Sequence, residues 1–431
     1  MKKTMINNTG IMMRSVNFLV LLLFAVAVIM GGCKKPDDDN GSGGNGGGGG
    51  NNGGGGGGNN GAVELTSPIN ESMTLKDLGK EVDYVYNGNR LLEVTGNAVL
   101  TIEPGVTIKF TNKNGGIKIN ELCQIEAIGT AEKPIKFIGE SEMKGSWSRI
   151  EILSFGDNRF KYCNFIGGGS NAAYAVIYQF LDKFGGPGST SLGMEYCNIK
   201  GSLGYGYYVK TNYFNGVTAF NHNTISGCDK APVYVTDLAH TQKFDLTSDF
   251  TGNKQNYIHV YSFQQLQSIT LNELNVPYYW SYNTSVDKQL TINEGVTICV
   301  APDCNISVLE QIKVKGTEQK PVTFTRLPEG AAYYWDGITF TGDEGEGYVL
   351  NWCIIEYCKS RAAISVVGDW FSGVGGKVTL NNVTIRNNQQ YGVEIRSNNC
   401  KVIHSGTNHR FFNNTKGNVL LPDGTVSDLL P

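Results

Sequence analysis

The chain has 431 residues and a net charge of −3, so it lacks the positive field with which nucleic-acid-binding proteins attract phosphate. Charged residues make up 17% of the chain, below the usual quarter, while glycine is frequent at 56 residues. Apolar residues reach 40%, which is enough for a core. This profile is typical of a β-rich protein with many turns, and we expect no nucleic-acid partner.

Residues 1–32 are predicted to be a lipoprotein signal peptide. Basic residues precede thirteen apolar residues, Phe18–Met30, which fit a signal-peptide core and are too few to span a bilayer. The run ends in Met30-Gly31-Gly32-Cys33, and small residues directly before a cysteine resemble the lipobox of bacterial lipoproteins. The resemblance implies that Cys33 carries the lipid. An ordinary secretory signal with an incidental cysteine is the alternative.

Residues 33–61 are predicted to form a flexible tether. Fifteen of the 21 residues from 41 to 61 are glycine and the rest are asparagine or serine, so no apolar side chain offsets the entropy of ordering them. The sequence KKPDDD after Cys33 resembles the export signal of lipoproteins displayed on the outer membrane of Gram-negative bacteria. We therefore expect a body that is lipid-anchored to the outer membrane and faces the cell exterior. A generic charged linker is the alternative.

The body, residues 62–431, consists of short apolar-alternating runs separated by glycine, asparagine and aspartate. Ile117–Ile119, Ile125–Ala127 and Ile135–Ile138 are examples, and each has the length and period of a short strand. We find no long segment with the 3.6-residue period of an amphipathic helix. The body is therefore predicted to be all-β.

The body also contains a duplication. Leu100–Phe110 reads LTIEPGVTIKF and Leu290–Val300 reads LTINEGVTICV, with seven of eleven positions identical. Ile125–Gly139 and Ile312–Arg326 likewise share GT-x2-KP between alternating apolar positions. The shared positions are apolar residues, threonines and a glycine, whereas the charged ones vary, so the phrase indicates architecture. We expect two repeat halves, at about 82–270 and 276–431.

A shorter repeat recurs within the halves. Asn223–Val235 and Ser248–Val260 share one scheme, 25 residues apart, in which a turn rich in glycine or asparagine separates alternating apolar residues. A unit of this size cannot bury its own apolar face and must stack on copies of itself. Short strands, regular turns and no helices predict a β-solenoid.

These phrases resemble a set of uncharacterised secreted bacterial proteins of the pectin-lyase-like superfamily. The matching pattern is L-T-I-x-x-G-V-T-I, then G-T-x-x-K-P, a Trp-led strand and a Y/W-C strand, and it covers nearly all of the body. The resemblance implies an all-β fold, a right-handed parallel β-helix (a single-stranded solenoid) built from two duplicated halves. In this reading Gly105 turns one corner of the coil, and Gly129 and Pro134 bracket the next.

Enzymes of that superfamily have recognisable active sites. Its hydrolases carry N-T-D, D-D and G-H-G motifs, but the only aspartate run here, Asp37-Asp38-Asp39, lies in the tether, and none of the five histidines sits in G-H-G. Its lyases use an Arg or Lys base beside calcium, and the acidic residues here are scattered. No catalytic residue is assigned. A polysaccharide lyase or glycoside hydrolase with an unfamiliar site is an alternative.

Neither a metal nor another cofactor is expected. Gly342–Gly347 (GDEGEG) offers three carboxylates, but their spacing matches no recognised calcium loop, so a solvated turn is favoured. Cys299 and Cys304 are spaced C-x4-C without histidine nearby, which argues against zinc and leaves a disulfide open. Cys163 and Cys353 occupy equivalent strand positions and are expected to be buried.

Aromatic residues are the strongest indication of ligand binding. An exposed ring can stack on the apolar face of a sugar, and tyrosine adds a polar tip. Trp147 and Trp335 recur in both halves, which favours a structural role, and Trp370 lies near a predicted turn. The candidate ligand-binding residues, for which stacking inside the solenoid is the alternative, are Tyr205, Tyr207, Tyr208, Tyr278, Tyr279 and Trp280.

The sequence therefore predicts a surface lipoprotein whose rod binds a glycan or another extended ligand without catalysis. Its expected partners are the membrane, through the lipid anchor, and a polysaccharide or surface protein. The catalytic alternative and a purely structural or adhesive rod stay open. The frequent asparagines, such as Asn382, Asn387, Asn388, Asn413 and Asn414, are interpreted as turn formers and as ladders between coils.

Overall fold

A computed structural model describes most of the body. The described residues are 61–181, 190–211, 216–261, 264–265, 267–328, 333–341, 347–368 and 373–431. The signal peptide, Cys33, the tether up to residue 60, residues 342–346 of the GDEGEG turn and Trp370 lie outside them. The described residues belong to one compact unit, Gly58–Pro431. Within the described ranges no helix has the length and apolar character needed to cross a membrane.

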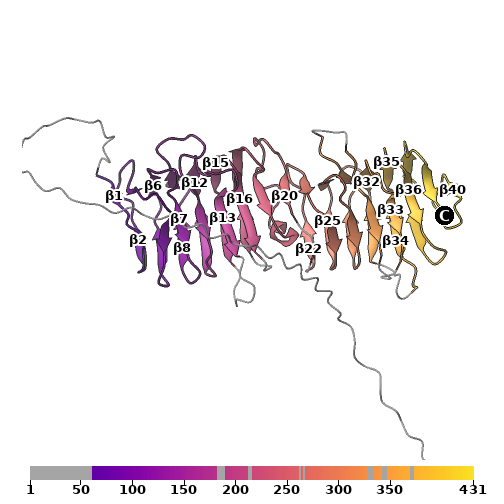
Figure 1. Cartoon of the computed structure of the whole chain (residues 1–431), viewed down its shortest axis with the longest axis horizontal. Coiled ribbons are helices and arrows are strands. Elements are labelled where there is room, and N and C mark those ends of the chain that lie inside the picture. Colours follow the sequence, from indigo (N-terminus) through magenta and orange to yellow (C-terminus); the bar gives the residue numbers. More distant parts are fainter. Residues whose placement is uncertain are drawn as a thin grey trace, which may run out of the picture. The chain divides into compact units, whose positions relative to one another are not determined.

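The predicted all-β parallel β-helix is confirmed. The strands of the described residues pair in parallel with the strand one coil before and one coil after, with one antiparallel exception at β39 and β40. Figure 1 shows the coils following one another in chain order. The strands form five sheets, which we call A to E.

Sheets A and C occupy the first half. Sheet A contains β1 (Val63–Glu64), β3 (Tyr84–Tyr86), β6 (Thr107–Phe110), β9 (Ile135–Ile138), β12 (Cys163–Ile166), β15 (Asn198–Ser202) and β18 (Thr224–Cys228). Sheet C contains β2 (Met73–Leu75), β5 (Val99–Ile102), β8 (Gln124–Ile128), β11 (Asp157–Lys161), β14 (Ser191–Glu195) and β17 (Val217–Asn221).

Sheet B, with 13 strands, runs through both halves. Its first-half strands are β4 (Leu92–Val94), β7 (Ile117–Ile119), β10 (Ile150–Ile152), β13 (Ala175–Leu181), β16 (Tyr205–Thr211) and β19 (Val233–Val235). The sheet continues through β20 (Ile258–Val260), β23 (Tyr278–Trp280), β26 (Thr297–Val300), β29 (Val322–Thr325), β32 (Cys353–Glu356), β35 (Thr384–Arg386) and β38 (Arg410–Phe412).

Sheets D and E occupy the second half. Sheet D contains β21 (Gln264–Gln265), β24 (Thr284–Val286), β27 (Ile306–Val308), β30 (Ile338–Phe340), β33 (Ala362–Val366), β36 (Tyr391–Ile395), β39 (Gly417–Leu420) and β40 (Val426–Ser427). Sheet E contains β22 (Ile269–Leu271), β25 (Leu290–Asn293), β28 (Ile312–Lys315), β31 (Tyr348–Asn351), β34 (Lys377–Asn381) and β37 (Lys401–Ser405).

The two copies of the repeated phrase fold alike but lie in different sheets. Leu100–Phe110 spans β5 of sheet C and β6 of sheet A, whereas Leu290–Val300 spans β25 of sheet E and β26 of sheet B. Sheet E therefore takes the role of sheet C, sheet B that of sheet A, and sheet D that of sheet B. Sheet B changes role at β20, which pairs with β19 on one side and β23 on the other.

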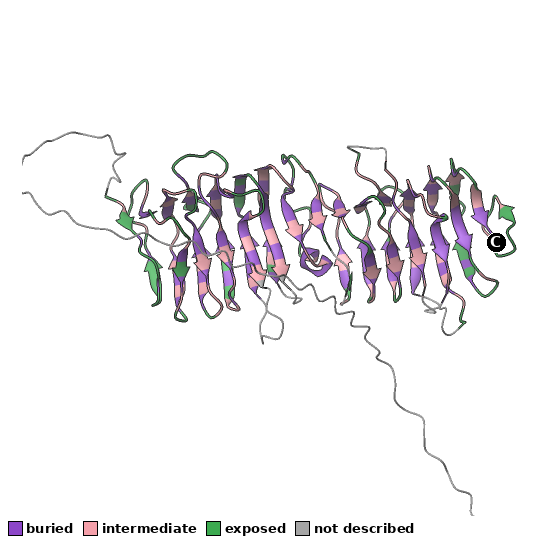
Figure 2. Ribbon diagram, viewed as in Figure 1, coloured by how far each residue is buried: buried purple, intermediate pink, exposed green. Residues whose placement is uncertain are grey.

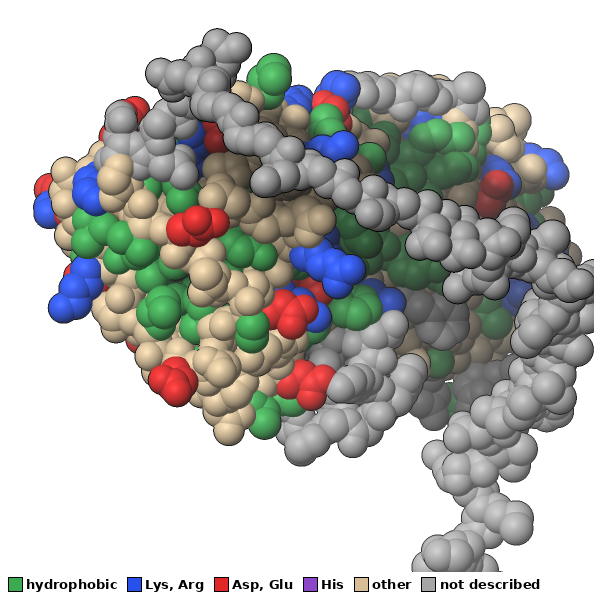
Figure 3. Space-filling model, turned by 60° about the vertical axis from the view of Figure 1, so that its left-hand side comes forward, with side chains coloured by type: hydrophobic (Ala, Val, Ile, Leu, Met, Phe, Trp, Pro, Cys, Tyr) green, Lys and Arg blue, Asp and Glu red, His purple; other side chains and the backbone are tan. Residues whose placement is uncertain are grey.

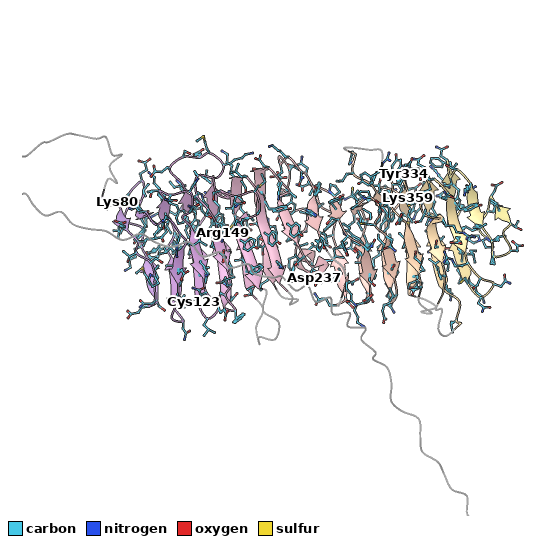
Figure 4. The ribbon with its side chains drawn as sticks, viewed as in Figure 1. Lys80, Cys123, Arg149, Asp237, Tyr334 and Lys359 are labelled. Carbon is cyan, nitrogen blue, oxygen red and sulfur yellow. The ribbon has the colours of Figure 1, made fainter. Side chains whose placement is uncertain are left out.

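A short helix that the sequence did not predict lies at this change. The 3-10 helix η1 (Leu238–Thr241) follows β19, where the order of the first half would place a strand of sheet C. The Asp237 side chain (labelled in Figure 4) accepts a hydrogen bond from the Ala239 N–H at 2.8 Å and so caps the helix. All four helix residues are buried, so this turn fills the interior in place of a strand.

The repeated glycine is explained by one corner of the coil. Gly105 and Gly295 have φ angles of 92° and 75°. The N–H groups of these glycines donate at 3.0 Å to the carbonyl oxygens of Lys133 and Lys320, one coil further on. A Cβ atom at Gly105 would lie 2.7 Å from the Asp77 carboxylate. Left-handed backbone and the close carboxylate both require glycine, so the phrase preserves a corner.

The core is continuous from coil to coil, and Figure 2 shows buried residues along the strands with exposed ones mainly at turns. Trp147 and Trp335 are fully buried, and their indole N–H groups donate at 2.8 Å to the carbonyl oxygens of Ile166 and Glu356. Their structural role is confirmed. Cys163 and Cys353 are buried as predicted. Cys299 and Cys304 are free thiols, so the disulfide left open by their spacing is not present.

Asparagine ladders between coils are confirmed as well. The Asn388 side chain accepts from the Cys358 N–H and donates to Asn414 Oδ1, both at 2.8 Å, inside the core. Asn387 and Asn413 adopt φ angles of 60° and 56° and bond to each other at 3.1 Å. Asparagine therefore serves both as a left-handed corner residue and as an internal bridge.

Replacing Asn388 with alanine tests the internal ladder. The Asn388→Ala variant strands the buried Cys358 N–H and one Asn414 oxygen, so we expect a loss of about 2 to 4 kcal/mol in the free energy of unfolding. Asn398→Ala, at an exposed turn, is the matched control and should change stability by less than about 0.5 kcal/mol. Urea unfolding measures both. Equal midpoints for the two variants would contradict the ladder's role.

Candidate ligand-binding surface

Outward-facing residues of five consecutive sheet B strands form one row, which we call the tyrosine strip. Along the strip each residue is the direct register partner of the next, from β13 through β16, β19 and β20 to β23. All five side chains are partly exposed. The strip consists of Tyr178, Tyr208, Tyr234, His259 and Tyr279. The strip crosses the point where sheet B changes role.

The rings of the strip stack on one another. Ring centroids of Tyr178 and Tyr208 lie 4.8 Å apart, and those of Tyr208 and Tyr234 lie 4.7 Å apart, with interplanar angles of 24° and 9°. The His259 ring then meets Tyr234 at 4.7 Å and 72°, edge to face. Both faces of Tyr208 are therefore covered. The strip presents ring edges and hydroxyls outward, where the sequence interpretation expected open ring faces.

Further aromatics and two cations flank the strip. Tyr174 meets Tyr178 edge to face at 5.4 Å, and the Arg149 guanidinium lies 4.2 Å above the Tyr174 ring. Arg149 (labelled in Figure 4) also donates to Glu151 at 2.7 Å. Tyr205 lies 5.1 Å from the Tyr234 ring, with the Lys230 ammonium 4.8 Å above it. Cation–π contacts of this kind fix both ring and cation in place.

Burial determines the protonation states of the tyrosine hydroxyls and of the histidine in the strip. Burial raises the pKa of the Tyr178 and Tyr234 hydroxyls, and neighbouring tyrosines add to the effect. Burial also lowers the pKa of His259 to about 4, helped by the charge of Lys230. Near neutral pH the strip therefore holds phenol hydroxyls and a neutral imidazole. The His259 Nε2 atom bonds Ser281 Oγ at 2.9 Å, whereas its Nδ1 atom is buried without a hydrogen-bond partner.

Three of the six predicted residues lie on or beside the strip. Tyr208 and Tyr279 belong to it, and Tyr205 packs against it while only 8% exposed. Tyr207, Tyr278 and Trp280 point inward and are at most 1% exposed, so they cannot contact an external ligand. Strand alternation explains the split because neighbouring residues on a strand face opposite sides.

Sequence reasoning missed Tyr178, Tyr234 and His259. None of the three has an aromatic residue directly beside it in the sequence, so local composition does not mark it. Two pieces of information together could have found these residues. The alternation of side chains along each strand shows which ones face outward, and the register between coils places them beside Tyr208 and Tyr279.

The second half shows what the fold itself requires at these positions. By the duplication, Tyr178 and Tyr208 correspond to Ser365 and Glu394 on β33 and β36 of sheet D. The rest of that row is short and polar, with Ser285, Ser307 and Thr339 in register. Serine, threonine and a glutamate paired with two arginines therefore suffice on this outer face, and the rings of Tyr178 and Tyr208 are not needed for the fold.

The strip ends on its second-half side at a hollow. A cavity of about 400 Å³ opens there, with Tyr257, Pro277 and Leu327 among its lining residues. The Tyr257 ring lies 4.9 Å from that of Tyr279, so the cavity continues the strip. Beyond it the sheet B row passes to Cys299, which is 1% exposed, and the aromatic surface stops.

Charges of both signs are interspersed on the face of the molecule in Figure 3, without a large field of one sign. The row has three carboxylates outside the strip, and each is paired with a cation: Glu93 with Lys118, Glu151 with Arg149 and Glu356 with Arg386. In the part of the chain that the structure describes, no group of three histidine, cysteine, aspartate or glutamate side chains is placed to bind a metal ion.

Comparisons with models of known families, with curated proteins and with solved structures found no match. The surface is therefore interpreted from its own geometry.

His259 predicts a pH dependence of stability. Because its pKa is about 4 in the folded protein and about 6.5 when unfolded, the unfolded chain takes up a proton that the folded chain refuses. The stability linked to His259 is thus present above about pH 6.5 and is lost as the pH falls towards 4. Unfolding midpoints of wild type and His259→Gln at pH 7.5 and pH 4.5 check this. The unfolding midpoint of the variant should fall less between pH 7.5 and pH 4.5 than that of wild type. Equal falls in the two proteins would contradict the role of His259.

Proposed function

We propose that the protein binds an extended glycan along the tyrosine strip and does not turn it over. The observation that carries the proposal is the row of five partly exposed aromatic side chains in register, in which Tyr178 and Tyr208 stand where the second half has Ser365 and Glu394. Five neighbouring strands give the row a length of roughly 19 Å, which suits a polymer more than a single sugar.

The ring stacking defines how the ligand is held. Stacked rings leave edges and hydroxyls facing outward, and a protonated tyrosine hydroxyl both donates and accepts hydrogen bonds. Sugar hydroxyls have the same dual character, so a glycan lying along the strip meets matching groups at each coil. Sugar stacking on open ring faces is confined to the flanks, at rings such as Tyr279 and Tyr257, which are tilted by 51°.

Binding without catalysis is favoured by the carboxylates of the same row. Glycoside hydrolysis needs two carboxyl groups facing the bond to be broken. Glu151 and Glu356 lie on opposite sides of the strip and each is occupied by an arginine at 2.5 Å and 2.7 Å. The relationship to the pectin-lyase-like superfamily, supported by the corner and strand phrases, is proposed at the level of fold only.

Removing strip rings tests the proposal. The double variant Tyr178→Ser/Tyr208→Ser brings the strip closer to the serine-rich face of the second half, so we expect the body to fold and glycan affinity to fall at least tenfold. Full-length protein in a sugar-free detergent is applied to an array of immobilised polysaccharides, and the best hits are titrated. A blank array, or unchanged affinity in the variant, would refute the proposal.

Two controls are included. One distinguishes the contribution of the hydroxyl from that of the ring, and the other distinguishes binding at the strip from binding elsewhere on the protein. Tyr208→Phe keeps the ring and removes the hydroxyl, so a smaller loss than in the serine variant is expected. Phe412→Ser removes an exposed aromatic ring outside the strip and should leave affinity for the polysaccharide unchanged.

We also propose that the body is displayed on the outer membrane through a lipid on Cys33. The support is the signal-peptide core, the Gly-Gly-Cys sequence and the glycine-rich tether that follows. The tether of 21 residues from 41 to 61 has a mean span of roughly 25 Å, enough to keep the strip clear of the lipid surface.

Lipid attachment is tested at Cys33. Because serine has no thiol to acylate, Cys33→Ser protein should move from the detergent phase to the aqueous phase in detergent partitioning. Cys123→Ser, a change at a buried cysteine of the body, should partition like wild type. Continued partitioning of Cys33→Ser into detergent would refute lipidation at this residue.

A further inference from the structure

The outer face of sheet C holds a second hollow, away from the strip. It is a cavity of about 550 Å³ that spans β8, β11, β14 and β17. Gly193 and Ala219 are register partners on its floor. The register shifts just before this pair, which leaves Thr218 as an extra residue in β17. A β-bulge of this kind re-aims side chains and is common beside binding sites.

The polar lining of this cavity is balanced in charge. Asp157 pairs with Arg159, and Lys161 lies 3.9 Å from Glu195. Asn221 donates to Glu195 at 2.9 Å, which further fixes that carboxylate. Two carboxylates face two cations, so a charged ligand would have to displace an existing pair. A neutral ligand with many hydroxyls can instead accept from the cations and donate to the carboxylates.

A ridge of three stacked rings borders the cavity. Tyr162, Tyr196 and His222 directly follow β11, β14 and β17, and we call them the aromatic ridge. Their ring centroids are 4.7 Å and 4.5 Å apart, nearly parallel. All three have left-handed backbone, with φ angles of 49°, 54° and 54°. Bulky residues rarely adopt this conformation, which costs roughly 1–2 kcal/mol each.

The second half shows that the corner does not need a ring at the Tyr196 position. By the duplication, Tyr196 corresponds to Asn382, which adopts the same φ of 54° and accepts a hydrogen bond from the next coil through Asn408 N–H. Asparagine tolerates left-handed backbone at less cost than tyrosine. Trp352, the counterpart of Tyr162, does carry a ring at a φ of 46°. At the Tyr196 position, therefore, the ridge holds a ring where asparagine is sufficient for the fold, beside a cavity of charge-balanced side chains.

We propose that this cavity and the aromatic ridge form a second carbohydrate site, which binds a short neutral oligosaccharide. The hydroxyls of the oligosaccharide contact Arg159, Lys161 and Glu195, while the aromatic ridge packs against a sugar ring. An extended peptide is disfavoured because the backbone groups of a sheet interior are already paired between coils and cannot add a strand. The site lies on sheet C and stands independently of the function proposed for sheet B.

The test uses variants that leave the fold intact. Tyr196→Asn/His222→Asn removes two ridge rings and relieves the left-handed backbone, so its unfolding midpoint should equal or exceed that of wild type. Ala219→Phe fills the floor of the cavity from its partly exposed position. Phe412→Ser, which removes an exposed aromatic ring on sheet B outside the strip, is the matched control.

Binding is measured by calorimetry with full-length protein in a sugar-free detergent. The probes are neutral tetrasaccharides of glucose, mannose, galactose and N-acetylglucosamine, with a uronic-acid tetrasaccharide as the charged comparison. We expect a neutral probe to bind wild type and the sheet B control equally, and to bind both sheet C variants at least tenfold more weakly.

Four results would overturn the second site. They are the absence of binding by every neutral probe, retained affinity in either sheet C variant, a loss confined to the sheet B control, and tighter binding of the uronic-acid probe. Failure of the strip proposal on the polysaccharide array would leave these results unaffected, so the two proposals are distinguishable.

Discussion

The parallel hydrogen bonding between coils is the constraint on which the rest of the structure depends. It holds each residue at a strand-to-strand spacing of ~4.8 Å from its register partner in the coils above and below. When successive coils carry similar residues at the same outward-facing position, their side chains therefore form a row along the sheet. The stacked tyrosines and the asparagine ladders are both products of this one geometry. Such a row can serve as a binding surface without any loop, because the strands themselves set its direction and the spacing of its side chains.

The duplication supplies an internal comparison that takes the place of related sequences. Where both halves keep a residue, as at Gly105 and Gly295 or Trp147 and Trp335, a corner angle or a buried indole hydrogen bond explains it. Where they differ on an outward face, the simpler half shows that the coil folds without the larger side chain. The fold therefore does not require tyrosine where the other half has serine on sheet B, or where it has asparagine beside sheet C. Both proposed sites rest on this difference.

The fold was readable from sequence because its determinants are local and repeated: strand alternation, corner glycines and the 25-residue register seen in the pairing of Val235 with Val260. The site was only partly readable. Tyr208 and Tyr279 were found because they lie in dense aromatic clusters, and the same clusters drew in Tyr207, Tyr278 and Trp280, which face the core. Tyr234 and His259 were missed because their neighbours in the strip are one coil away. The helix η1 was missed because four residues carry too little periodicity to register.

The strand β20 lies where sheet B passes from one role to the other, and its counterpart in the first half is β1 of sheet A, because β1 pairs with β3 as β20 pairs with β23. Its outward residue, His259, therefore corresponds to Glu64, so only one half carries a ring at this position. A duplication that joins its copies one sheet out of phase brings strands of two different roles together in a single sheet. The strip crosses that junction, so its first three residues lie on strands of one role and its last two on strands of the other.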